Sequence, residues 1–285
     1  MSHVTYFSKA CFGVPVGLSP RLGYLGAMID PAIAAATVVL LRDGPDAPEL
    51  LLLERHRNTA FAGGAMVFPG GRVDPGDLAV VANPTLASGF ADLDPVDAAA
   101  RVAAARETLE EADVVLSHGP AIDPVLRADW RARLNANAAT YGDFLAIVGH
   151  RLDVGALVPF AHWVPPAAAK IARRFDTRFY LAVLPDGESV TPDGHEAVTA
   201  YWTTAAAAVA RADAGEIGLV FPTRRNLERL AQYADLPTLL ATTRARPLTL
   251  TQPAIVERDG AMWLTIPPGC DYPVTEERLD AVRRE

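Results

Sequence analysis

The chain has 285 residues, of which half are hydrophobic and about a fifth are charged, as is usual for a soluble globular protein. A net charge of −8 argues against binding to nucleic acid through general electrostatic attraction. No apolar run is long enough to span a membrane, residues 1–10 carry no signal-peptide pattern, and two distant cysteines do not make a disulfide framework. We therefore expect a cytoplasmic protein with reduced thiols and with neither membrane nor nucleic-acid partners.

The beginning of the chain is rich in glycine and proline. Residues 1–31 are interpreted as an irregular extension, and residues 32–285 as a single domain. Within it, the β-branched apolar run at 32–41 predicts a buried strand. Turn residues at 43–46 lead back to a second strand at 49–54, so the two strands are expected to form a hairpin.

A basic segment and a glycine pair follow this hairpin. Arg55 and Arg57 are either a solvated strand end or a cationic patch that meets phosphate groups. A loop of small residues and a short strand at 65–68 then lead to Gly70-Gly71, which predicts a tight loop whose backbone can approach a ligand. Pro75-Gly76 is a turn signal. Residues 78–93 are expected to form a loop with little regular structure.

The next segment predicts a long helix that carries an acidic face. Asp94 is a good N-cap, Pro95 suits the first helical position, and the alanine-rich run favours helix to about residue 112. On this helix Glu107, Glu110 and Glu111 share one face, where like charges repel. The face is either a solvated acidic surface or a site for a hard divalent cation, which takes oxygen ligands and often lies against phosphates. Arg106 can steady Glu110, four residues further on.

The second half of the chain predicts further helices and strands. An insertion at 118–150 is expected to hold two helices and to act either as a structural appendage or as a substrate-recognition cap. The expected helices are 124–139, 142–150, 205–214 and 222–233. The expected strands are 157–164, a strand that ends at 184, and 196–202. A final hairpin is expected at 254–266, with its turn at Asp259-Gly260.

Several polar residues of this half have two interpretations. Arg174 either pairs locally with Asp176 or contacts a substrate phosphate. Glu196 begins a strand on the face of a valine and a tryptophan, where a carboxylate is unusual unless it has a partner; the alternative is an edge-strand carboxylate in solvent. Glu188 and Glu216, beside a turn and a helix end, are expected to be solvated.

The glycine pair and the acidic helix together resemble the Nudix box, G-x5-E-x7-R-E-U-x-E-E-x-G-U with U apolar, the signature of Nudix hydrolases. Three residues depart from it: Asp77 stands at the first Glu, Thr108 at an apolar position and Asp113 at the last Gly. The box is also split, because 28 residues lie between Asp77 and Arg106 where the box has seven.

The split box and the segment Arg174-Phe175-Asp176-Thr177 look like the Nudix branch that includes the peroxisomal coenzyme A diphosphatases. The resemblance implies a Nudix-type α/β/α sandwich with a mixed β-sheet, extended by the helical insertion and the C-terminal hairpin. It also implies Mg2+- or Mn2+-dependent hydrolysis of a nucleoside diphosphate linked to another moiety, with coenzyme A or acyl-coenzyme A as the first candidate. ADP-ribose or a dinucleotide is the alternative substrate. A Nudix-like sensor that has lost catalysis is the alternative class, and a homodimer is left open.

The resemblance also implies a set of site residues. The expected metal ligands are Glu107, Glu110, Glu111 and the carbonyl of Gly70, with Arg106 as a further catalytic residue. Glu196 is expected to be a further metal ligand or the base that activates water. The residues expected to bind the substrate are Arg55, Arg57, Phe61, Gly71 and Arg174.

Overall fold

A computed structural model of the protein describes residues 32–57, 63–90, 93–166 and 173–282. The predicted extension at 1–31 and the predicted substrate-binding residue Phe61 lie outside these ranges. The described residues all belong to one compact unit. None of the helices in the described ranges has the length and apolar character needed to cross a membrane.

A mixed sheet of nine described strands forms the centre of this unit. Its first strand, β1 (Ile33–Arg42), pairs antiparallel with β2 (Glu49–Arg55) at the predicted hairpin and parallel with β8 (Phe175–Val183) along its length. β3 (Ala65–Val67) pairs with β2, whereas β4 (Gly70–Arg72) pairs with β1. Just before the glycine pair, the chain therefore passes from pairing with β2 to pairing with β1. The remaining strands of the sheet are β7 (Val158–Trp163), β9 (Ala197–Thr204), β10 (Gly218–Leu219) and β11 (Leu250–Thr251).

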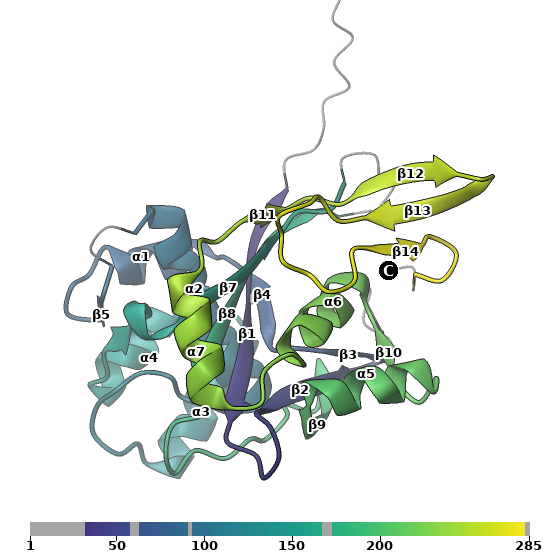
Figure 1. Ribbon diagram of the computed structural model, residues 1–285. Coiled ribbons are helices and arrows are strands. Elements are labelled where there is room, and N and C mark those ends of the chain that lie inside the picture. Colours follow the sequence, from purple (N-terminus) through teal and green to yellow (C-terminus); the bar gives the residue numbers. More distant parts are fainter. Residues whose placement is uncertain (1–31, 58–62, 91–92, 167–172, 283–285) are drawn as a thin grey trace, which may run out of the picture. The chain divides into compact units, whose positions relative to one another are not determined.

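Alternation along the central strands sends side chains into two cores on opposite faces of the sheet. Val38 and Leu40 of β1 belong to one core, and Val39 and Leu41 to the other. The helices α1 to α4 cover the first face and α5 to α7 the second, so the predicted α/β/α sandwich is confirmed (Figure 1). The helices are α1 (Pro75–Val81), α2 (Pro95–Ala112), α3 (Pro124–Asn135), α4 (Tyr141–Val148), α5 (Ala205–Asp213), α6 (Phe221–Leu230) and α7 (Leu236–Ala245).

Helix α2 forms as the sequence predicts and positions the acidic face. The side chain of Asp94 accepts hydrogen bonds from the amides of Val96 and Asp97, which are unpaired donors at the start of the helix. The run from Ala98 to Ala105 is buried throughout, and its small side chains let the helix lie close to the sheet. The same fit brings the C-terminal half of α2 against β4.

Some expectations about loops are wrong. The glycine pair lies in β4 rather than in a tight loop, because Gly70 and Gly71 pair with β1. The turn signal at Pro75 instead begins α1, with Asp74 as N-cap, and this helix takes in the first four residues of the predicted loop at 78–93. That loop also contains β5 (Ala87–Ser88), which pairs with β6 (Leu152–Asp153). Helix α7 was not predicted, although Asp235 caps it.

The other predicted elements are confirmed to within a few residues. Helices α3 and α4 make up the insertion. The final hairpin consists of β12 (Ala254–Arg258) and β13 (Ala261–Thr265), which turn at the predicted Asp259-Gly260. β14 (Glu276–Arg278), which was not predicted, adds a third strand to this small separate sheet (Figure 1).

Candidate active site

The three glutamates of α2 lie on the side of the helix that faces β4. The side chains of Glu107 and Glu110 are each 14% exposed, and Glu111 is 6% exposed, so this is not a solvated acidic surface. Oε2 of Glu111 accepts a hydrogen bond from the amide of Gly70 at 3.0 Å. A Cβ atom at Gly71 would overlap the carboxylate of Glu107, so a larger residue there would force that carboxylate to move.

Arg106 ties the acidic residues to one another. Its Nη1 donates to Glu107 Oε1 at 2.8 Å and to Glu110 Oε2 at 2.9 Å. Its Nε and Nη2 donate to the two carboxylate oxygens of Asp77 at 3.1 and 3.2 Å. Nη2 also donates to the carbonyl of Arg72 at 2.8 Å. The guanidinium therefore steadies two glutamates and joins α2 to α1 and β4.

Helix α1 brings the first half of the split box into contact with the second half in space. Asp77 lies in its first turn, forms a reciprocal capping box with Asp74 and is 1% exposed. The residues between Asp77 and Arg106 leave the site and return to it, so the two side chains meet despite their separation in the sequence. In the sequence, Asp77 stands out only as a departure from the box. The N-cap pattern Asp74-Pro75 was the signal that could have placed it on a helix.

Burial makes the carboxylates of this cluster poor acids. Desolvation raises the pKa of Glu107, raises the pKa of Glu110 to about 8, and raises the pKa of Glu111 well above its usual value. The charge of Glu107 adds to the shifts at Glu110 and Glu111. Arg106 and Arg55 lower these pKa values only in part, so the cluster is short of positive charge.

Glu196 and Arg55 lie at the exposed rim of the same cluster. Oε2 of Glu196 is 3.4 Å from Nη2 of Arg55, and the Glu196 side chain is 61% exposed. The charge of Glu196 contributes to the raised pKa values of Glu107 and Glu111, which places it close to both. The structure thus brings these two predicted site residues together with the glutamates of α2.

Two predicted substrate-binding residues lie elsewhere. Arg57 is exposed in the turn after β2. Nη2 of Arg174 donates to the carbonyl of Pro165 at 3.0 Å, just before β8. Asp176, its suggested partner, lies 2.5 Å from Nε2 of His162, with Arg178 at 3.6 Å.

The remaining departures from the box are accommodated in α2 and at its end. Thr108 is buried at an expected apolar position, and its hydroxyl donates to the carbonyl of Ala104 at 2.7 Å, so no polar group is left unpaired. Asp113 caps the helix with φ of 57° and ψ of 38°, the left-handed region that favours glycine.

An ion-pair cluster beside Asp113 was not predicted. Nε of Arg127, from α3, donates to Asp113 Oδ1 at 2.9 Å, and its Nη1 and Nη2 donate to Glu188 at 3.0 and 2.7 Å. Glu188 also accepts the amide of Val115 at 3.0 Å, so the expectation that it is solvated is wrong. Glu216 is 57% exposed, as expected. No local pattern in the sequence places Arg127 next to Glu188, because they come from segments far apart in the chain.

The donor set of the cluster fits a hard divalent cation. In the part of the chain that the structure describes, no three acidic, histidine or cysteine side chains already surround one point as a metal site. The carboxylates of Glu107 and Glu110 are instead turned to Arg106, and that of Glu111 to the Gly70 amide. Buried carboxylates with too little positive charge nearby are the ligands that Mg2+, Mn2+ and similar cations prefer.

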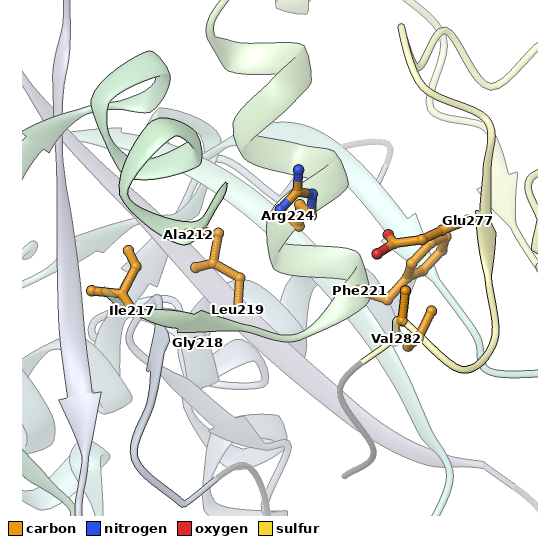
Figure 2. A pocket seen from close by; sticks show the side chains of 9 residues that line it. Ala212, Ile217, Gly218, Leu219, Phe221, Arg224, Glu277 and Val282 are labelled. Atoms are coloured by element: carbon orange, nitrogen blue, oxygen red, sulfur yellow. The ribbon is translucent and has the colours of Figure 1, made fainter. Parts of the chain in front are cut away.

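Two hollows lie outside this cluster. A cavity of about 150 Å³ is bounded by β10, α6 and the chain end; Arg224 and Glu277 line it together with apolar residues such as Phe221 (Figure 2). A more open hollow of about 440 Å³ lies between α3 and the segment before β9, and its lining includes Arg131 and His195. Neither hollow is lined by the glutamates of α2.

Comparisons with known proteins agree with this geometry. The family profile of the NUDT19 Nudix domain matches residues 83–230, which include all of α2. The chain is 29% identical over 274 residues to acyl-coenzyme A diphosphatase NUDT19 of Gallus gallus, a match that covers 78% of this chain and 72% of that protein. It is 30% identical over 233 residues to the Homo sapiens protein of the same name, covering 67% of this chain and 62% of that one.

A solved structure is similar as well. The crystal structure of a NUDIX hydrolase from Alicyclobacillus acidocaldarius superposes with a TM-score of 0.66 at 29% identity, covering 78% of this chain and all of that one.

Proposed function

This chain belongs to the Nudix hydrolase family, and its similarity to acyl-coenzyme A diphosphatases supports a diphosphatase enzyme; we propose that its substrate is coenzyme A or an acyl-coenzyme A. The names of the relatives from Gallus gallus and Homo sapiens support this substrate class. The observation that carries the proposal for the reaction is the group of three buried glutamates on α2, with raised pKa values and too little positive charge nearby. Such a group suits a divalent cation that neutralises a diphosphate.

The proposed mechanism assigns a task to each residue of the cluster. Glu107, Glu110 and Glu111 would hold Mg2+ or Mn2+, together with the carbonyl of Gly70. The bound cation would neutralise the diphosphate oxygens and lower the pKa of a water ligand. Arg106 would keep the glutamates in place through its hydrogen bonds to Glu107 and Glu110.

Residues around the cluster would activate water and hold the substrate. We propose that Glu196 is a further ligand or the base that takes a proton from the attacking water. Arg55, 3.4 Å from Glu196, would bind a phosphate beside it. Arg57, Phe61, Gly71 and Arg174 stay predicted substrate-binding residues. The cytoplasmic location, the homodimer and the absence of nucleic-acid and membrane partners also stay predictions.

A substrate screen tests the proposal. The purified chain is incubated with coenzyme A, acetyl-coenzyme A, ADP-ribose and a diadenosine polyphosphate, each with Mg2+, with Mn2+ or with a chelator, and the products are identified by mass. We expect 3′,5′-ADP and a phosphopantetheine product, formed only with the cation. Cleavage of ADP-ribose with coenzyme A left intact would instead support the alternative substrate, and no cleavage of any compound would support the sensor class.

A further inference from the structure

The end of helix α2 combines catalytic importance with an unfavourable backbone conformation. Glu110 and Glu111, two of the proposed metal ligands, lie in the last turn of the helix. The cap that follows is Asp113, whose φ of 57° lies in the left-handed region, which glycine adopts most readily and aspartate adopts at some cost. Contacts from outside the helix offset that cost.

Arg127 of α3 supplies most of those contacts. It donates to Asp113 Oδ1 at 2.9 Å and also to the Asp113 carbonyl, so it forms hydrogen bonds with both the side chain and the backbone of the cap residue. Nη1 and Nη2 of Arg127 also form a two-pronged pair with Glu188, and Glu188 accepts a hydrogen bond from the amide of Val115. The side chains of all three residues are mostly buried, at 19% exposure for Arg127, 27% for Asp113 and 17% for Glu188. We call Asp113, Arg127 and Glu188 the cap clamp.

Neighbouring contacts reinforce the clamp at the same helix end. The last carbonyls of a helix lack partners within the helix and carry partial negative charge. Here Nε of Arg131 donates to the carbonyl of Glu110 at 3.0 Å, and the amide of Thr191 donates to that of Ala112 at 2.9 Å. Helix α2 has no basic residue in its own last turn, and the arginines that donate to its end, Arg127 and Arg131, belong to α3.

We propose that Arg127 is a positioning residue, which sets the metal affinity of Glu110 and Glu111 by holding the left-handed cap of α2 through the cap clamp. The helical insertion then has a positioning role, because α3 takes over the role that a cap glycine would play. This inference rests on the proposed metal-dependent function. The described side-chain contacts of Arg127 are with Asp113 and Glu188, neither of which is a proposed metal ligand.

The test compares variants of the full chain by two measurements, which are Mn2+ binding by calorimetry and thermal unfolding in a chelator. Arg127→Met removes the guanidinium and keeps the side-chain stem. Arg133→Met is the matched control on the same helix, because the guanidinium of Arg133 pairs with exposed Asp129 at 2.8 Å and lies over the ring of Trp130 rather than at the cap clamp. We expect Arg127→Met to weaken Mn2+ binding by about 10- to 100-fold, as outer-shell changes do, and Arg133→Met to leave it unchanged. Turnover of Arg127→Met should recover at saturating Mn2+.

A second substitution distinguishes positioning from general stability. Glycine adopts the cap conformation without help, so Arg127→Met combined with Asp113→Gly should regain most of the lost Mn2+ affinity. A lowered unfolding temperature with unchanged Mn2+ affinity in Arg127→Met would overturn the inference. The inference would also fail if the double variant bound Mn2+ as weakly as Arg127→Met does.

Two further outcomes are also decisive. If Arg127→Met does not fold, Arg127→Lys keeps the charge but cannot make the fork of hydrogen bonds, and it should also bind Mn2+ more weakly; wild-type affinity would contradict the inference. If the wild-type chain itself binds no Mn2+, the proposed function fails and the inference fails with it.

Discussion

Two regions of the molecule bury carboxylates beside arginines, one on α2 and the other on α6. On α6, Glu228 lies 3.1 Å from Arg224 and 2.8 Å from Arg225, and Arg225 also lies 3.2 Å from Glu277. Each of these carboxylates therefore has a guanidinium within ion-pair distance. Desolvation raises the pKa of Glu228, but the two arginines act against that shift.

The cluster on α2 is not balanced in this way. Arg106 is shared among Asp77, Glu107 and Glu110. Glu111 has no guanidinium within ion-pair distance among the described residues, and its closest polar partner there is the Gly70 amide. Raised carboxylate pKa values alone therefore do not mark a cation site, since both clusters have them. The surplus of negative charge distinguishes the candidate site on α2 from the structural ion pairs on α6.

Among the predicted changes, Glu111→Gln in the α2 cluster should have the largest effect on turnover. Loss of a charged ligand for the cation should lower turnover by about 1000-fold, because a metal ion supplies several kcal/mol of charge stabilisation. The metal-free variant should be as stable as the wild type or more stable, since repulsion with Glu107 falls. Turnover and metal-free thermal unfolding measure the two effects. Wild-type turnover in the variant would place the metal site elsewhere.

Glu196→Gln tests whether the exposed rim belongs to the site. Loss of a general base should lower turnover by about 100-fold with metal affinity kept, whereas loss of a ligand should weaken metal binding and be rescued in part by more Mn2+. A Mn2+ titration of turnover separates the two roles. Glu216→Gln, a surface carboxylate paired with Arg211 at 3.1 Å, is the control. Near-normal rates for Glu196→Gln at every Mn2+ concentration would exclude both roles.

Glu228→Gln should produce the opposite pattern to Glu111→Gln. It leaves Arg225, which is 2% exposed, with only one carboxylate partner among those described. We expect the free energy of unfolding to fall by about 1–3 kcal/mol, with turnover unchanged. Urea denaturation and the coenzyme A assay measure these. A rise in stability would show that this cluster, too, carries surplus charge.

The pH dependence of stability tests the charge of Glu110 without a cation. Burial raises the pKa of Glu110 to about 8, above its value in the unfolded chain, so its stabilising contribution is complete below about pH 4.5 and is lost as the pH rises through 8. In a chelator, Glu110→Gln should therefore gain stability relative to the wild type between pH 5 and pH 8, by about 1 kcal/mol or more. Urea denaturation at several pH values measures the difference. A constant difference would mean that Glu110 is ionised throughout.

The elements that the sequence predicted well are those with local signals. Asp94 and Pro95 mark the start of α2, and the alternating apolar residues of β1 mark a buried strand. Local signals also misled, since Pro75 can begin either a turn or a helix, and only the capping contact between Asp74 and Asp77 decides for a helix.

The parts of the site that the sequence could not predict depend on distant contacts. The spacing of the glutamates predicted a shared face, but their burial follows from how α2 lies against β4. Likewise, the ion pairs at the cap residue Asp113 depend on Arg127 and Glu188, which lie in separate segments of the chain. A pattern within one helix indicates which residues can act together, whereas the charge balance around them is a property of the fold.

Thermal unfolding with and without Mn2+ tests the central claim most directly, namely that the surplus negative charge on α2 is a divalent-cation site. A ligand that binds only the folded state at 100 times its Kd adds about 2.7 kcal/mol to the free energy of unfolding. We predict that excess Mn2+ raises the unfolding temperature of the wild type and of Glu228→Gln equally, and that of Glu111→Gln by much less. An equal rise in Glu111→Gln and in the wild type would contradict the account.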